Sequence, residues 1–186
     1  MNDQEILFKL LKIIDECDIN LKENDIFDFL KIRNRWPIKY QWGQPTIEII
    51  SQFNLNSSND FFDLNGLFIY ERWIQYYNMG FTTVISNVLD LNSQLRELQE
   101  KIFAYTGSKI NGNFYFSSGS ANHRVSFPPH KHDYNVIVKP IYGKSKWNIS
   151  GKDLEISNKS LLIPLGEEHS VYECVDKKLS LTLNIL

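Results

Sequence analysis

The second half of the chain is a succession of short apolar segments separated by turn residues, and this pattern restricts the fold more than any other feature. The segments are rich in β-branched and aromatic residues, which favour extended backbone. Predicted strands cover residues 109–117, 134–141, 145–149, 154–156, 160–163, 170–174 and 179–185. Short strands at close intervals indicate a sandwich or barrel.

Helical periodicity dominates the first 80 residues instead. Apolar residues recur three and four positions apart, which is the spacing of an amphipathic helix. Predicted helices cover residues 3–16, 24–33, 46–53 and 70–78. A further strand over 81–85 and a helix over 92–106 lead into the β region.

A chain of 186 residues, 42% of them hydrophobic, is long enough to bury one core. No linker divides it, so we expect a single domain over residues 1–186. In this domain the helical part, 1–80, packs on a barrel formed by 81–186. The predicted fold class is therefore mainly β with N-terminal helices.

The composition excludes several classes of function. A net charge of −2 gives no basis for nucleic-acid binding. Cys17 and Cys174, far apart in the sequence, are expected to be free thiols in a reducing compartment. The acidic N-terminus does not resemble a secretory signal, and no apolar run is long enough to cross a bilayer. We therefore expect a cytoplasmic protein with no membrane partner.

All four histidines lie between residues 123 and 169. His130 and His132 precede an apolar run, and His169 follows a later proline-glycine turn. Residues two apart in a strand point the same way, and imidazole is the commonest metal ligand. We therefore predict a mononuclear metal site of His130, His132 and His169, with coordination positions left open. The alternative for the first two histidines is a pair of exposed polar residues at a strand start.

Around these histidines the sequence resembles the two motifs of the cupin superfamily. His130-x-His132, with Gly143 eleven residues on, is similar to the first motif, and Pro164-x-Gly166-x-x-His169 is similar to the second. The first motif usually has a further glutamate ligand, where this chain has Val136. The resemblance implies a double-stranded β-helix, the cupin or jelly-roll barrel, around a metal.

A second set of matches, over residues 70–186, resembles the Jumonji C-like branch of cupins, the Fe(II)- and 2-oxoglutarate-dependent hydroxylases. The pieces occur in the family's order: Gly80-Phe81-Thr82-Thr83-Val84, Asn113-Phe114-Tyr115, Pro128-Pro129-His130, Gly143-Lys144-Ser145-Lys146-Trp147 and Ile163-Pro164-Leu165-Gly166-Glu167-Glu168-His169. The resemblance implies Fe(II), O2 and a peptide, amino acid or small metabolite as substrate. Because related proteins often dimerise through elements flanking the barrel, it also implies a homodimer.

Two residues depart from the Jumonji-like pattern. His132 stands where the family has an aspartate ligand, so a set of two histidines and a carboxylate becomes three histidines. Ser145 stands where the family has a lysine that pairs with the far carboxylate of 2-oxoglutarate. A buried carboxylate without a cationic partner is costly. Either Arg124 or Lys178 supplies the cation, the chain bulges, or 2-oxoglutarate is not the co-substrate.

The family match and the strand period also give candidate pocket residues. They are Asn113, Tyr115, Arg124, Val136, Ser145 and Trp147, with His123 beside Arg124 and Val138 in phase with Val136. For the loop residues the alternative is solvation, and for the aromatic residues it is packing in the core. Asp133 adjoins His132, but adjacent strand residues face opposite sides, so we expect it at most to support a ligand. Glu167 and Glu168 are expected at the surface.

Three functions fit these features. The first is an Fe(II)-dependent oxygenase of the Jumonji-like type that uses O2 and 2-oxoglutarate. The second is a three-histidine cupin metalloenzyme, a dioxygenase or an isomerase, that does not use 2-oxoglutarate. The third is a non-catalytic cupin binding protein. Three imidazoles accept Fe, Zn, Ni, Cu or Co, so the choice of Fe(II) rests on the resemblance.

Overall fold

The computed structural model describes residues 3–32, 47–50, 60–65, 67–119, 127–174 and 176–185. The helices are α1 (Asp3–Glu16), α2 (Glu23–Ile32), α3 (Tyr70–Asn78), α4 (Ser93–Thr106) and a short 3-10 helix, η2 (Val88–Asp90). The strands are β1 (Ile47–Ile50), β2 (Thr82–Ile85), β3 (Asn111–Ser117), β4 (Phe127–His130), β5 (Asn135–Tyr142), β6 (Ser145–Ile149), β7 (Lys152–Ile156), β8 (Leu161–Ile163), β9 (His169–Cys174) and β10 (Lys178–Ile185). Within the described ranges, no helix is both long enough and apolar enough to span a bilayer.

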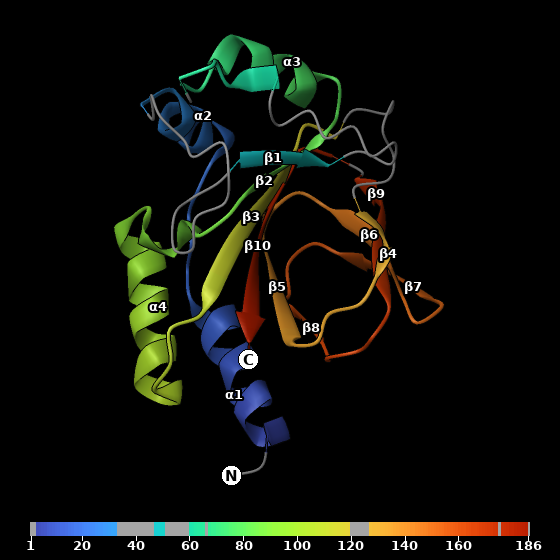
Figure 1. Ribbon diagram of the computed structural model, residues 1–186. Helices are drawn as coiled ribbons and strands as arrows, with labels where there is room; N and C mark the ends of the chain where they lie inside the picture. The colour runs from blue at the N-terminus through green and yellow to red at the C-terminus, as the bar shows by residue number, and fades with distance from the viewer. Residues whose placement is uncertain are drawn as a thin grey trace.

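The strands form two sheets that face each other (Figure 1). The larger sheet has the order β1-β2-β3-β10-β5-β8, and the smaller has the order β4-β9-β6-β7. The pairings between these strands are antiparallel. After β3 the chain crosses repeatedly from one sheet to the other, which is the winding of a jelly roll.

The larger sheet separates two hydrophobic clusters. Successive strand side chains point to opposite faces. Leu179, Leu181 and Leu183 of β10 lie on the face covered by the helices, in a cluster that includes residues of all four α-helices. Val136 and Val138 of β5 lie on the other face, in the cluster between the two sheets. The second face of the larger sheet is therefore the inner wall of the barrel.

Helix α1 is attached to the outer face of the larger sheet by hydrogen bonds as well as by packing. Lys139 of β5 is only 9% exposed, and its ammonium donates to the carbonyls of Ile14 at 2.8 Å and Asp15 at 3.3 Å. Carbonyls at the end of a helix lack helical partners and carry the negative end of its dipole. The Asp15 carboxylate accepts from the backbone N–H of Ser160 at 2.8 Å. These contacts join the N-terminal helix to the strands of the barrel.

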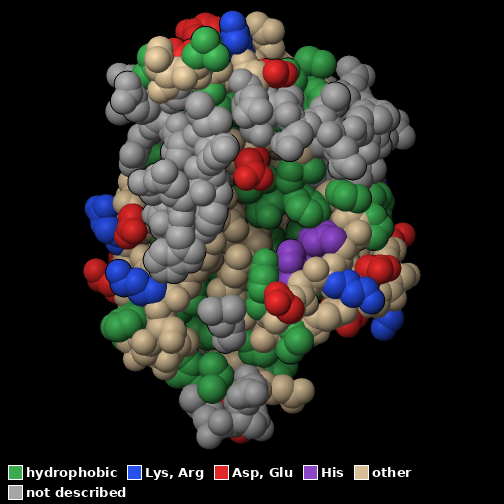
Figure 2. Space-filling view, in the orientation of Figure 1, with side chains coloured by type: hydrophobic (Ala, Val, Ile, Leu, Met, Phe, Trp, Pro, Cys, Tyr) green, Lys and Arg blue, Asp and Glu red, His purple; other side chains and the backbone are tan. Residues whose placement is uncertain are grey.

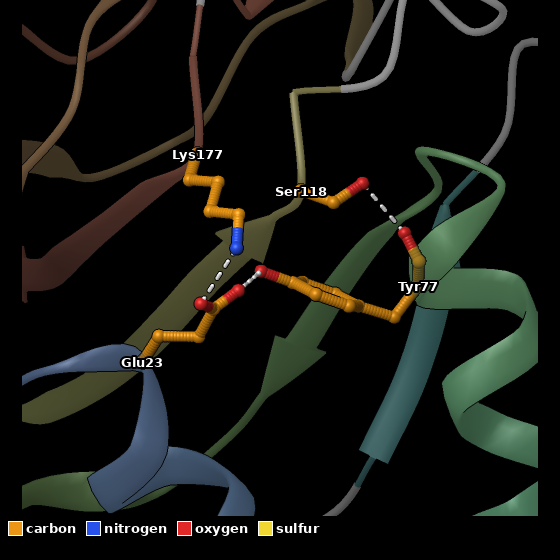
Figure 3. Close-up of polar contacts among 4 residues, drawn as sticks. All are labelled: Glu23, Tyr77, Ser118 and Lys177. Carbon is orange, nitrogen blue, oxygen red and sulfur yellow. Dashed lines mark hydrogen bonds and ion pairs between the residues drawn. The ribbon is translucent and has the colours of Figure 1, made fainter.

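A polar cluster ties α2 and α3 to the ends of β3 and β10 (Figure 3). Glu23 of α2 accepts a hydrogen bond from the Tyr77 hydroxyl of α3 at 2.6 Å and from the Lys177 ammonium at 2.8 Å. The Ser118 hydroxyl, directly after β3, donates to the Tyr77 carbonyl at 2.7 Å. Lys177 directly precedes β10, so this cluster holds the point at which β10 begins.

Two elements differ from the sequence-based prediction. The helix predicted over 46–53 is wrong in the part described, because Ile47–Ile50 is strand β1, paired with β2. Its alternation of buried Ile47 and Ile49 with exposed Glu48 is that of a strand. Strand β4 was not predicted; it is only four residues long, and its register with β9 shifts. The other predicted helices and strands are present, with ends shifted by a few residues.

Candidate metal centre

The pairing of β4 with β9 brings two of the three histidines together. His130 ends β4, His169 begins β9, and the two residues are direct partners in the antiparallel register. Side chains of directly opposed residues project from the same face of a sheet. Here that face is the inner one, and the two ring centroids lie 4.2 Å apart.

His132 reaches the same place from the loop after β4. The strand ends at His130, so the two-residue strand period is not the reason that the two side chains converge. The His132 ring centroid lies 4.8 Å from that of His130 and 5.1 Å from that of His169. The Gly166 N–H donates to the His132 carbonyl at 2.8 Å, and the Tyr134 ring stacks on the imidazole at 4.7 Å. The hydrogen bond from Gly166 joins the His132 loop to the turn before His169.

Backbone carbonyls determine which nitrogen is free on two of the rings. Nδ1 of His130 lies 2.8 Å from the Pro128 oxygen, and Nδ1 of His169 lies 3.0 Å from the Glu167 oxygen. A carbonyl only accepts, so each Nδ1 carries the proton and each Nε2 keeps its lone pair. Hydrogen bonds of this kind orient metal-binding histidines and raise their basicity.

Burial lowers the pKa of both His130 and His132, because the surrounding apolar groups disfavour the charged imidazolium. His169 lowers the pKa of His130 further, and His130 and His169 together lower the pKa of His132. The hydrogen bond to Pro128 acts in the opposite direction on His130 but does not reverse the shift. Both rings are therefore neutral at physiological pH, which is the form that binds a metal.

The three histidines lie beside a cavity between the two sheets, with a volume of about 30 Å³. Its apolar lining consists of Phe127, Val136, Val138, Trp147, Ile163 and Val171. Its other polar lining residues are Tyr115, Lys178, Ser180 and Thr182. Figure 2 shows histidine side chains at the surface next to hydrophobic ones, so the cavity opens on this face.

Half of the predicted pocket residues line this cavity, namely Tyr115, Val136 and Trp147. Val138 lines it as well, as its phase with Val136 predicted. Burial raises the pKa of the Tyr115 hydroxyl, with smaller contributions from Tyr134 and Glu48, so the hydroxyl stays protonated and can donate a hydrogen bond.

The structure places the other predicted pocket residues elsewhere. Ser145 is buried and is not among the lining residues, and its Oγ accepts from Nε1 of Trp147 at 2.8 Å. Asn113 does not line the cavity either, and its side-chain oxygen accepts from the Asn87 N–H at 3.3 Å. The predictions for Arg124 and His123 lie outside the described residues.

The acidic residues near the histidines are not placed as ligands. Asp133 and Glu168 are exposed, and Glu167 supports His169 through its backbone carbonyl rather than its carboxylate. Sequence reasoning missed Ser180 and Thr182 on the cavity wall. In the sequence of β10, leucines alternate with polar residues. On a strand with one face in solvent the polar residues point outward, so this alternation did not identify Ser180 and Thr182 as cavity residues.

The donor set fits a transition-metal ion. The candidate ligand atoms of His130, His132 and His169 all lie within 4.8 Å of one another. Three imidazoles on one side of a mainly apolar cavity leave coordination positions open toward the cavity. No Asp or Glu is among the described lining residues, so an ion held here would keep its full positive charge.

Comparison with known proteins supports the fold rather than a specific activity. No protein-family model matches the sequence, and no curated protein matches it. The structure is similar to that of YcfD, a ribosomal oxygenase from Escherichia coli in complex with cobalt and succinic acid. The TM-score is 0.61 at 12% identity, and the match covers 90% of this chain and 44% of YcfD. A cupin superfamily protein from Desulfitobacterium hafniense matches 41% of this chain and 67% of its own, with a TM-score of 0.35 and 6% identity.

The similarity to the YcfD structure, together with the two antiparallel sheets, confirms the predicted fold class. The protein has a double-stranded β-helix, the cupin or jelly-roll barrel, with N-terminal helices. The chain spans less than half the length of YcfD, and the identity is low. The likeness therefore defines the architecture, and the activity has to be argued from the site.

Proposed function

We propose that this protein is a metal-dependent oxygenase of the Jumonji-like cupin type. The observation that carries the proposal is the convergence of His130, His132 and His169 on one cavity inside a cupin barrel. The complex of YcfD with cobalt and succinic acid supports a divalent metal, for which the family resemblance favours Fe(II). The substrates are O2 and a peptide, amino acid or small metabolite, with 2-oxoglutarate as co-substrate.

A bound metal would supply a redox-active Lewis acid with open coordination positions. The chain supplies the geometry and the surroundings. The carbonyls of Pro128 and Glu167 keep two imidazoles oriented. Val136, Val138 and Val171 form dry walls that exclude water from the reacting groups.

A three-histidine metalloenzyme that does not use 2-oxoglutarate is the second candidate, acting as a dioxygenase or an isomerase. Two observations favour it. His132 replaces the carboxylate of the usual ligand set, and Ser145, at the family's lysine position, is hydrogen-bonded to Trp147 outside the cavity lining. A binding protein without catalysis is the third candidate, and the absence of stoichiometric metal would favour it.

The test is to reconstitute the purified protein anaerobically with Fe(II) and then to measure bound metal and O2 uptake, with and without 2-oxoglutarate. Stoichiometric iron and O2 uptake that depends on 2-oxoglutarate, with release of succinate, support the first proposal. O2 uptake or isomerisation that is independent of 2-oxoglutarate supports the second. Absence of both iron binding and O2 uptake would contradict the oxygenase assignment.

A further inference from the structure

The three candidate ligands are not held in the same way. The Nδ1 atoms of His130 and His169 lie 2.8 Å and 3.0 Å from the backbone oxygens of Pro128 and Glu167. Within the described ranges, no hydrogen bond joins either ring nitrogen of His132 to another residue. The orientation of this third imidazole must therefore have another cause.

His132 also lacks the support of a strand. β4 ends at His130, and His132 lies in the connection between β4 and β5. His130 and His169, by contrast, are direct partners in the pairing of β4 with β9. The sheet register therefore places two of the ligands, and the third depends on contacts made by the loop that carries it.

The Tyr134 ring stacks on the His132 imidazole, with the ring centroids 4.7 Å apart and an angle of 17° between the ring planes. The rings of His130 and His169 meet that of His132 at 80° and 46°, so neither of them lies flat against it. A stacked neighbour restricts the tilt of a ring, because a tilted imidazole would collide with the phenol face. The lone pair of an imidazole lies in the ring plane, so the stack restricts the direction in which His132 can bind a metal.

Backbone contacts hold the segment that contains Tyr134. The Gly166 N–H donates to the His132 carbonyl at 2.8 Å, and the Leu165 N–H donates to the side-chain oxygen of Asn135 at 3.1 Å. Both donors belong to the turn that precedes β9. The residues on both sides of Tyr134 are therefore attached to the same turn, which keeps the stacked pair in place.

We propose that Tyr134 is a positioning residue that sets the orientation of His132 and, through it, the metal affinity of the site. This inference rests on the proposed metal at the three histidines. Tyr134 is not among the described residues that line the cavity, so its effect is exerted through His132 rather than through contact with a substrate. The face of the ring makes the contact with His132, so the hydroxyl is not required. Phenylalanine should therefore replace tyrosine, and leucine should not.

The experiment compares Co(II) binding by the wild type, Tyr134→Phe and Tyr134→Leu, measured by titration and by the visible spectrum of the bound ion. Groups that orient a metal-binding histidine contribute about 10- to 100-fold to metal affinity. We expect Tyr134→Leu to lose about tenfold in affinity and to change the cobalt spectrum at saturation, because a misoriented imidazole alters the ligand field. Tyr134→Phe should retain both. Tyr172→Leu is the matched control, because Tyr172 is a partly buried tyrosine of β9 outside the described cavity lining.

A second measurement needs no metal. Protons that lie over the face of an aromatic ring are shifted upfield in NMR spectra. The ring protons of His132 should therefore be shifted upfield in the metal-free wild type and in Tyr134→Phe, and the shift should be smaller in Tyr134→Leu. Absence of the shift from the wild type would overturn the proposal, whether or not Tyr134→Leu folds.

The outcomes distinguish the role of Tyr134 from the existence of the metal site. If the wild type binds no cobalt, the three-histidine site is wrong and the role of Tyr134 is wrong with it. Cobalt binding by the wild type with equal affinity in Tyr134→Leu would overturn only the role of Tyr134. A loss in Tyr134→Phe or in Tyr172→Leu as large as that in Tyr134→Leu would overturn it as well.

Discussion

His130 and His169 face each other directly across the pairing of β4 with β9, and their ring centroids are 4.2 Å apart. Neither side chain is placed by its own neighbours in the sequence alone. The two come together only when the smaller sheet has formed, because the register of β4 against β9 makes them partners. A ligand that needs both rings binds the folded state and therefore stabilises it.

We predict that His169→Ala abolishes stoichiometric metal binding. His169 supplies one of the three candidate ligand atoms, and no Asp or Glu among the described lining residues is placed to replace it. Loss of a partner that only supports a ligand costs about 10- to 100-fold in metal affinity, so loss of a direct ligand should cost more than about 100-fold. Metal analysis after gel filtration gives the stoichiometry, and circular dichroism checks that the fold is kept.

Asp133→Asn is the matched control for this prediction. Asp133 adjoins His132 in the sequence, but its side chain is exposed. Its replacement should leave the bound metal unchanged. Equal metal content in wild type and His169→Ala, or a loss in Asp133→Asn, would require a different ligand set.

We predict that Ser145→Ala lowers stability but not metal binding. The Ser145 Oγ accepts from Nε1 of Trp147 at 2.8 Å, and both residues are buried. Removal of the acceptor leaves a buried N–H donor unpaired, which costs about 2 kcal/mol of unfolding free energy. Urea unfolding measures the loss. Unchanged stability together with weaker binding of 2-oxoglutarate would instead place Ser145 in the pocket.

Local signals in the sequence were sufficient for most of the secondary structure, and they identified the three histidines of the cluster, although not the strand pairing that brings two of them together. The Asn92 side chain caps α4 by accepting from the Leu95 N–H at 2.8 Å, and Gly107 ends the helix in the left-handed conformation. These are effects of residues a few positions apart, which a single sequence displays. The proline-glycine turn before His169 likewise preceded a predicted strand, whereas β4, which ends at His130, was not predicted.

The features that the sequence did not predict depend on contacts between residues far apart in the chain. Ile47–Ile50 is a strand because β2 pairs with it, although its apolar residues also fit a short helix. The sequence around Ser145 does not show that its hydroxyl accepts a hydrogen bond from Trp147. The inward direction of Lys178 follows from the position of β10 between β3 and β5, which is a property of the whole barrel.

We predict that Gly143→Ala destabilises the protein more than Gly151→Ala does. Both glycines have positive φ angles, of 79° and 83°, so alanine is strained at either position. A Cβ at Gly143 would also lie 2.0 Å from the Lys177 carbonyl oxygen, whereas a Cβ at Gly151 would meet nothing within 4 Å. We expect losses of about 3 kcal/mol for Gly143→Ala and about 1 kcal/mol for Gly151→Ala in urea unfolding. Equal losses would mean that the backbone before β10 moves freely.

We predict that the contribution of Glu23 to stability disappears in acid. Burial by itself would raise the pKa of this carboxyl, but the hydrogen bonds from Lys177 and Tyr77 outweigh it and hold the pKa below its usual value. A carboxyl whose pKa is lowered by folding stabilises the folded state above the pKa of the unfolded chain, about 4.3. This contribution is lost as the pH falls through the lower pKa of the folded state.

The measurement is the difference in unfolding free energy between the wild type and Glu23→Gln, followed from about pH 7 to about pH 3. Other carboxyl groups titrate in both proteins, so the difference isolates Glu23. The wild type should be more stable by about 2 kcal/mol near neutral pH, because two hydrogen bonds to a charged group are weakened in the variant. The difference should shrink below about pH 4. A difference that stays constant down to the lowest pH would show that the charge of Glu23 does not contribute, and that Tyr77 and Lys177 hold glutamine equally well.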